Sequence, residues 1–200
     1  MEEIREQKKE LRSRLKAKAA NLPEAYCRMA DEGIREQVCA LAEFEQADVI
    51  FCYVGTDREI NTVPILQEIW KRGKKPGVPK CISRGVMKVY EIQSMDDLEE
   101  GAYGILEPKN GCREIKAEEI DLALIPCLAA ARDGRRLGYG GGYYDRYLEK
   151  AGFFKAVLCR EQMLEEQLQG EGHDVQMDAV ISEKTAGYVR KHTSYAIEVV

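Results

Sequence analysis

The chain has 200 residues, of which 44% are hydrophobic and 32% are charged, and its formal net charge is −5. These values predict one domain over residues 1–200 and argue against general binding to nucleic acid or to a membrane surface, although a local basic patch is compatible with them. No apolar run approaches the roughly 20 residues that a membrane span needs.

The seven cysteines are an odd number and contain no CxxC pair. They are best interpreted as free thiols in a reducing cytoplasm, most of them serving as small core residues. The first twelve residues are charged throughout and show no signal peptide, so we expect a cytoplasmic protein. His173 and His192 are the only histidines, and neither lies beside a cysteine. The sequence therefore argues against a zinc site.

Residues 3–20 are predicted to form a helix with one basic face, which includes Lys8, Lys9 and Arg12. Lys8 and Arg12 are four residues apart and therefore share a face of the helix. Two interpretations stay open: the face is simply solvated, or Lys8 and Arg12 reach a polyphosphate. A second helix is predicted to begin at Leu22–Pro23, with proline in its first turn.

Residues 48–54 form a continuous apolar run that predicts a buried strand of a parallel sheet. The polar segment 55–62 follows, and a helical pattern resumes at Val63. In open α/β sheets ligands bind beyond the carboxyl ends of strands, so Glu59 and Thr56 are placed where a substrate would bind. The alternative is that Glu59 is a solvated loop acid and that Thr62 caps the next helix.

The rest of the chain alternates between predicted strands and helical segments. This alternation predicts an α/β layered fold around a mostly parallel sheet. The strands are expected at 75–82, 86–92, 120–125, 153–159 and 178–182, with a short helix and surface loop at 96–108 and a helical stretch at 161–168.

Residues 135–145 read RRLGYGGGYYD and form the most informative segment of the sequence. Glycines allow positive φ and let several backbone N–H groups face one anion, and the two arginines before them suit phosphate. The spacing matches neither a Walker A loop nor GxGxxG. A tight surface turn would not need the flanking guanidinium groups, aromatic rings and carboxylate, so we favour a phosphate-binding segment.

Residues 125–148, IPCLAAARDGRRLGYGGGYYDRYL, closely resemble the signature of the 5-formyltetrahydrofolate cyclo-ligase family, also called methenyltetrahydrofolate synthetases. KKELRSRLK, YVGTDREINT, ILEP and HDVQMDAVIS fit further landmarks of the family in the right order. One departure is that Ala130 and Ala131 stand where members often carry Phe-Asp. Without this carboxylate the loop can be less well ordered, or a contact that the carboxylate makes in other family members can be lost.

The resemblance implies an ATP-dependent, magnesium-requiring conversion of 5-formyltetrahydrofolate into 5,10-methenyltetrahydrofolate, with release of ADP and phosphate. It also implies an α/β fold, a three-layer α/β/α sandwich similar to the ribose-phosphate isomerase and coenzyme A transferase group. We further expect a monomer whose small-molecule substrate can carry a polyglutamate tail.

The expected site residues fall into four groups. Arg136 and Tyr143 are predicted to be catalytic, and Tyr143 to stack on the pterin or line its pocket. Asp145 is predicted to bind Mg²⁺ with Asp178 as a second carboxylate, although Asp178 can also be a plain acid at the start of a strand. The nucleotide is assigned to Lys8, Lys9, Arg12, Arg136, Leu137, Gly138, Tyr139, Gly140, Gly141, Gly142, Tyr143 and Tyr144. The folate is assigned to Thr56, Glu59, Tyr139, Gly140, Gly141, Gly142 and Tyr143, while Tyr144 can instead belong to the core.

Two other classes of function remain open from sequence. One is a non-catalytic member of the same fold that binds a nucleotide or folate and regulates a partner, supported only by Ala130 and Ala131. The other is a sugar-phosphate isomerase or acyl-transfer enzyme on a similar sandwich, which needs its own acid or base but no ATP. ATP dependence separates the last class from a cyclo-ligase.

Overall fold

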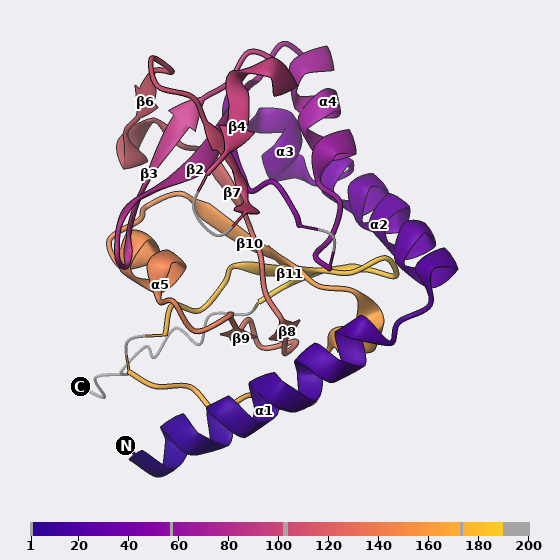
Figure 1. Ribbon diagram of the computed structural model, residues 1–200. Coiled ribbons are helices and arrows are strands. Elements are labelled where there is room, and N and C mark those ends of the chain that lie inside the picture. The colour runs from indigo at the N-terminus through magenta and orange to yellow at the C-terminus, as the bar shows by residue number, and fades with distance from the viewer. Residues whose placement is uncertain (1, 57, 102–103, 173, 190–200) are drawn as a thin grey trace, which may run out of the picture.

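An eight-stranded mixed sheet runs through the centre of the protein (Figure 1). The computed structural model describes residues 2–56, 58–101, 104–172 and 174–189. The strand order within the sheet is β12–β11–β10–β7–β1–β2–β3–β6. The strands are β1 (Val49–Cys52), β2 (Lys75–Ser83), β3 (Val86–Glu91), β6 (Glu114–Ile115), β7 (Leu122–Ile125), β10 (Phe154–Leu158), β11 (Ala179–Ile181) and β12 (Ala186–Tyr188).

The middle of this sheet is parallel and its two margins are antiparallel. Strand β1 pairs in parallel with β2 on one side and with β7 on the other, and β10 and β11 continue the parallel part beyond β7. Strands β12, β3 and β6 add antiparallel edges. The chain thus winds in opposite directions from β1, and the junction of β1 and β7 is the switch point at which α/β sheets bind ligands.

Helices cover both faces of the sheet and make three layers (Figure 1). Because side chains alternate along a strand, Ile50 and Cys52 pack on one face and Phe51 on the other. The first face is covered by α2 (Glu24–Cys39), α3 (Ala42–Gln46) and α4 (Val63–Lys71), and the second by α1 (Glu2–Ala20) and α5 (Tyr143–Leu148). The predicted three-layer sandwich with a mostly parallel sheet is therefore confirmed.

Short elements connect these layers, and two sequence predictions about them were wrong. Residues 161–168 are not helical: only η4 (Glu161–Met163) forms, because the chain then runs beside β8, where Glu165 N–H donates to Ala130 O. The short helix expected near residue 96 corresponds to η1 (Met95–Asp97), but residues 98–100 and 106–108 pair as antiparallel strands where a surface loop was expected. The remaining elements are β4 (Leu98–Glu100), β5 (Leu106–Pro108), η3 (Ala117–Glu119), β8 (Ala129–Ala130) and β9 (Arg136–Leu137).

Ala130 and Ala131, the departure from the usual Phe-Asp, lie in and just after β8. Both are fully buried, and Ala131 N–H donates to Arg135 O across the turn that joins β8 to β9. The hairpin that leads into the glycine-rich segment is therefore formed with alanines at both positions.

Among the described residues, no helix combines the length and the apolar character that crossing a membrane requires.

Candidate active site

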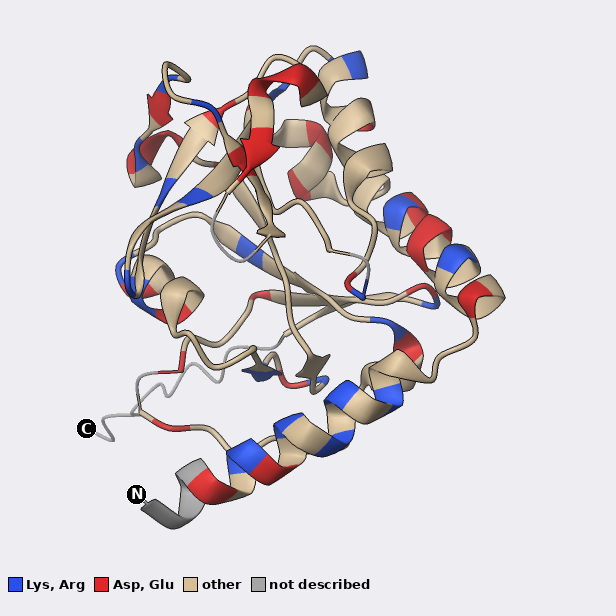
Figure 2. Ribbon diagram, in the orientation of Figure 1, with Lys and Arg blue, Asp and Glu red and all other residues tan. Residues whose placement is uncertain are grey.

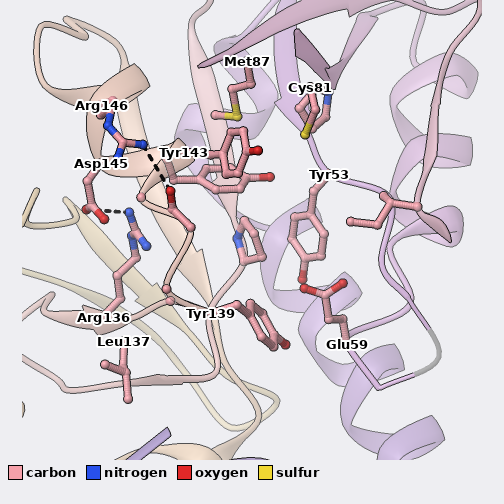
Figure 3. A pocket seen from close by; sticks show the side chains of 18 of the residues that line it. Tyr53, Glu59, Cys81, Met87, Arg136, Leu137, Tyr139, Tyr143, Asp145 and Arg146 are labelled. Atoms are coloured by element: carbon pink, nitrogen blue, oxygen red, sulfur yellow. Dashed lines mark hydrogen bonds and ion pairs between the residues drawn. The ribbon is translucent and has the colours of Figure 1, made fainter. Parts of the chain in front are cut away.

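A cavity of about 870 Å³ lies beyond the carboxyl ends of β1 and β7, at the switch point of the sheet. Its walls come from distant parts of the chain: α1, the loop after β1, the β2–β3 hairpin, β5, residues 136–146 and the loop at 171–174. Arg136, Asp145 and Arg146 occupy one side and Tyr53 and Glu59 the opposite side (Figure 3). A volume of this size lies within the usual range of small-molecule sites.

The glycine-rich segment 138–142 forms one wall of this cavity. Gly140 and Gly142 have φ of 103° and 67°, which residues with a Cβ rarely adopt. A Cβ on Gly141 would lie 2.8 Å from Cδ2 of Tyr143, so the absence of a side chain lets this ring pack against the backbone. Helix α5, which follows, has only six residues, so its dipole adds less at this wall than that of a longer helix.

Arg136 and Asp145 form a partly buried ion pair in the same wall (Figure 3). Arg136 Nη2 donates to Asp145 Oδ1 at 2.8 Å, and the Arg136 side chain is only 4% exposed. The Nε of Arg136 is buried and has no hydrogen-bond partner among the described residues. A buried donor of this kind is costly without an acceptor, so the site is prepared for an anionic ligand.

Lys8 is the more buried of the two α1 residues that line the cavity. Its ammonium contacts Glu171 Oε2 at 2.9 Å and Asp174 Oδ2 at 2.6 Å, and the residue is 7% exposed. Burial alone lowers the pKa of this ammonium, but the two carboxylates outweigh it and raise the pKa above the ordinary value. Lys8 therefore stays charged at neutral pH, and the carboxylates of Glu171 and Asp174 balance its positive charge.

Arg12 joins α1 to the glycine-rich segment, one turn along the basic face visible in Figure 2. Its Nε donates to Gly138 O at 2.9 Å, and its guanidinium lies close to Gly140. Lys9, which we also expected at the nucleotide, is exposed, pairs with Glu6 and does not line the cavity. Lys8 and Arg12 thus reach the site, whereas Lys9 belongs to the solvated side of the helix.

Glu59 faces this wall from the loop after β1. Its Oε2 accepts hydrogen bonds from both the N–H and the hydroxyl of Thr56, each at 3.0 Å. The hydroxyl of Tyr53 points toward the same carboxylate (Figure 3). Burial and the nearby Glu59 charge raise the pKa of Tyr53 and of Tyr139, so both phenols remain protonated and can donate hydrogen bonds.

The alternative interpretation held that Thr62 caps α4, but its hydroxyl makes no capping hydrogen bond to that helix. It donates to Tyr53 O at 2.5 Å and accepts from Gly55 N–H, and so closes the loop that carries Glu59.

The β2–β3 hairpin and β5 contribute the apolar part of the cavity, with Met87 and Cys81 above the central space (Figure 3). Burial is the main cause that raises the pKa of the Cys81 thiol to about 11, and the adjacent Glu107 carboxylate adds to the shift. Glu107 itself is 5% exposed, and its Oε1 accepts from Cys81 N–H at 3.0 Å. This wall therefore presents a neutral thiol and a carboxylate among apolar groups.

We expect Cys81 to react slowly with iodoacetamide at pH 8, because only the thiolate reacts and a pKa of about 11 leaves about 0.1% of it ionised. The rate constant should rise about tenfold per pH unit from pH 8 to 10. Mass spectrometry of the Cys81 peptide at each pH measures the rate. A rate that levels off near pH 9 would contradict the raised pKa.

Most of the residues predicted from sequence converge on this cavity, although they come from three separate segments. Leu137 and Tyr144 line it as well, and Tyr144 also stacks on Phe51 of the core with ring centroids 6.0 Å apart. Asp178 does not line it: its Oδ2 accepts from Lys155 N–H at 2.9 Å and pairs with the Lys155 ammonium at 3.2 Å.

Sequence reasoning missed Tyr53, Glu107, Arg146 and the pair Glu171 and Asp174. Arg146 donates to Gly85 O and Gly141 O and so links the glycine-rich segment to the β2–β3 turn. Its position four residues after Gly142, inside the segment 125–148 that resembles the family signature, was the available signal. The acids of the 171–174 loop gave none, because their partner Lys8 is more than 160 residues away.

The fold and the site define an α/β sandwich enzyme with a glycine-rich anion-binding segment at its switch point. Comparison with known proteins is consistent with this class. A sequence model of the 5-formyltetrahydrofolate cyclo-ligase family matches residues 4–183, and the chain belongs to that family. It is an enzyme that converts 5-formyltetrahydrofolate into 5,10-methenyltetrahydrofolate.

Similar proteins share most of their length with this chain. A Schizosaccharomyces pombe protein named "Probable 5-formyltetrahydrofolate cyclo-ligase" is 29% identical in an alignment of length 192 that covers 88% of this chain and 94% of the yeast protein. The 5-formyltetrahydrofolate cyclo-ligase of Haemophilus influenzae is 27% identical over 72% of this chain and 79% of its own length. The NMR structure of 5,10-methenyltetrahydrofolate synthetase from Aquifex aeolicus superposes with a TM-score of 0.82 at 28% identity, covering 94% of this chain and 98% of that one.

Proposed function

We propose that this protein uses ATP to activate the formyl oxygen of 5-formyltetrahydrofolate and that the glycine-rich segment holds the triphosphate. The family is ATP-dependent. The observation that carries the proposal is the buried Nε of Arg136, which lacks a partner among the described residues and lies beside five residues of glycine-rich backbone. Arg12 and Lys8 add positive charge on the side of α1.

The need for ATP follows from the chemistry of the substrate. A formyl amide is a poor electrophile, and its oxygen is a poor leaving group. In the first step the formyl oxygen attacks the γ-phosphorus, an O–P bond forms, and the bond to the β-phosphate oxygen breaks to release ADP. Such a transfer needs positioning and charge neutralisation more than a protein nucleophile. Arg136 supplies neutralisation through its planar guanidinium, and backbone N–H groups of 138–142 supply donors.

In the second step N10 attacks the formyl carbon, which forms the new C–N bond. N10 then loses its proton, and the C–O bond breaks with release of inorganic phosphate. We assign Glu59 to the polar edge of the folate and Tyr143, which packs on Gly141 in the same cavity, to its pterin ring. Thr56 bonds to the Glu59 carboxylate, and the side chains of Tyr53 and Tyr139 lie on the same side of the cavity. This wall would orient the substrate toward the glycine-rich segment.

For magnesium, Asp145 fits the role of a protein ligand, whereas Asp178 does not. At phosphate sites Mg²⁺ takes one or two carboxylates together with substrate phosphates, and it neutralises the charge of the transferred group. Asp145 lies in the cavity wall beside Arg136. Among the described residues no group of three or more Asp, Glu, His or Cys side chains could hold a metal by itself. A site completed by nucleotide oxygens is the arrangement that these residues support.

Isotope transfer tests the proposed route. Substrate labelled with ¹⁸O at the formyl group should deliver the label to inorganic phosphate, because that oxygen forms the O–P bond and leaves with phosphorus. Mass spectrometry of the phosphate, with product absorbance in the near ultraviolet as a measure of turnover, gives the answer. Label found in water, with unlabelled phosphate, would contradict phosphorylation of the formyl oxygen.

Gly141→Ala is expected to raise the KM for 5-formyltetrahydrofolate about tenfold, equivalent to about 1.4 kcal/mol. The new Cβ would meet the Tyr143 ring at 2.8 Å and displace it from the substrate wall. Gly152→Ala is the matched control, because a Cβ there meets nothing within 4 Å. Steady-state kinetics on both variants make the measurement; equal KM values would mean that the Tyr143 ring does not contact the folate.

The cellular setting also remains a proposal. We infer that the protein is a cytoplasmic monomer. The seven free cysteines of the structure support the cytoplasmic location. The acidic net charge argues against nucleic acid as a partner. Arg146, a cation in the cavity lining, is available to a polyglutamate tail on the substrate.

A further inference from the structure

A buried ion pair lies behind the loop that carries Glu59, outside the cavity lining. Arg160, at the end of β10, and Asp31, on α2, are 7% and 14% exposed. The pair is bidentate: Arg160 Nε contacts Asp31 Oδ1 at 2.8 Å, and Nη2 contacts Oδ2 at 3.0 Å. Such a pair recovers at most its desolvation cost, so pairing alone does not explain its presence.

The same two side chains also hold the backbone of the Glu59 loop. Arg160 Nη2 donates to Glu59 O at 2.7 Å, and Nη1 donates to the carbonyl oxygen of Arg58 at 3.3 Å. Asp31 Oδ2 accepts from Asn61 N–H at 3.0 Å. Backbone groups on both sides of Glu59 are therefore fixed by one guanidinium–carboxylate unit, which belongs to two other elements of the fold.

This attachment matters because the described residues between β1 and α4 belong to no helix or strand. The ends of the loop are closed by the Thr62 hydroxyl, and the Glu59 carboxylate is held on the cavity side by Thr56. Within the loop, Glu59 N–H donates to Thr56 O at 2.9 Å, and Arg160 and Asp31 add the contacts that reach the main chain from other elements of the fold. A shift of this backbone would move the carboxylate away from a bound ligand, and displacements of about 1 Å are enough to lower activity strongly.

We propose that Arg160 and Asp31 are positioning residues for the folate substrate, acting through the backbone of Glu59 and Asn61. The inference rests on the proposed contact between Glu59 and the folate. Neither residue lines the cavity, so neither is a catalytic residue. Their loss should weaken folate binding and leave the nucleotide side, which is built by α1 and residues 136–146, unaffected.

The test compares Arg160→Met, Asp31→Asn and Glu59→Ala with the double variant of Arg160→Met and Glu59→Ala. We expect Arg160→Met and Asp31→Asn to raise the KM for 5-formyltetrahydrofolate about tenfold, the effect of losing about 1.4 kcal/mol. The KM for ATP should change less than about twofold. In the Glu59→Ala background Arg160→Met should add little, because two changes that act through one contact are not additive.

The matched control is Arg132→Met, which removes an ion pair with Glu161 next to Arg160 but no contact to the loop. Thermal unfolding of every variant separates folding from function, and Asp31→Asn, which preserves the side-chain shape, serves if Arg160→Met does not fold. If both KM values rise by the same factor, the pair acts on the fold as a whole and the proposal is overturned.

The remaining outcomes tell the two proposals apart. A large effect of Glu59→Ala without any effect of Arg160→Met and Asp31→Asn overturns the positioning role alone. Full additivity in the double variant does the same. An unchanged folate KM in Glu59→Ala overturns the substrate role of Glu59, and the positioning role falls with it.

Discussion

Asp145→Asn is expected to lower kcat about a hundredfold or more and to leave the protein folded. The change removes the negative charge that we propose as the Mg²⁺ ligand at the transferred phosphate, and groups that stabilise developing charge in an active site contribute effects of this size. An asparagine oxygen can still accept from Arg136 and from Val175 N–H, which bond to Asp145 at 2.8 and 3.3 Å. Titration of activity with Mg²⁺, together with thermal unfolding, makes the measurement.

Asp178→Asn is the informative control for this variant, because sequence alone made both acids metal candidates. Asp178 is 8% exposed and is bonded to Lys155 away from the cavity. Its loss should lower the melting temperature and leave the Mg²⁺ dependence unchanged. Full activity of Asp145→Asn, or a changed Mg²⁺ dependence in Asp178→Asn alone, would show that the metal assignment is wrong.

Arg136→Met is expected to lower kcat/KM for ATP about a thousandfold, equivalent to about 4 kcal/mol. The Arg136 side chain is only 4% exposed, and low exposure would strengthen the proposed interaction with phosphate. Arg136→Lys should restore little, since an ammonium cannot reproduce the planar set of donors that bonds to Asp145 and presents Nε. Steady-state kinetics and calorimetric binding of ADP measure the loss.

Arg135→Met provides the comparison within the same segment. Arg135 is exposed, pairs with Asp133 and does not line the cavity, so its removal should change kcat/KM less than about threefold. If Arg136→Met retained activity within a factor of ten, or if both variants lost it equally, the proposed role of Arg136 at the phosphates would be contradicted.

The regular elements of the fold were predictable because their patterns are local. The apolar run at 48–54 and the helical spacing after Val63 correspond to β1 and α4, and the pattern at 3–20 corresponds to α1. The acidic stretch 161–168 also has a helical composition, yet it extends beside β8 because Glu165 N–H bonds to Ala130 O. Such a contact depends on the tertiary fold and is not visible in a local pattern.

The site was predictable where residues lie at strand ends or in glycine-rich sequence. Glu59 follows β1 and the glycines follow β7, and adjacent parallel strands bring both to one edge of the sheet. Long-range ion pairs were not predictable: Lys8 meets Glu171 and Asp174, and Asp31 meets Arg160, only in the folded protein. The position of Asp178 was misjudged for the same reason, since its partner Lys155 lies on a neighbouring strand.

One measurement tests the central claim most directly: a crystal structure with 5-formyltetrahydrofolate, Mg²⁺ and an ATP analogue that cannot transfer its γ-phosphate. We predict that the triphosphate lies along Gly138–Gly142 within hydrogen-bond distance of Arg136 Nε, with its γ-phosphorus facing the formyl oxygen. A triphosphate bound elsewhere, with residues 138–142 facing solvent, would contradict the account.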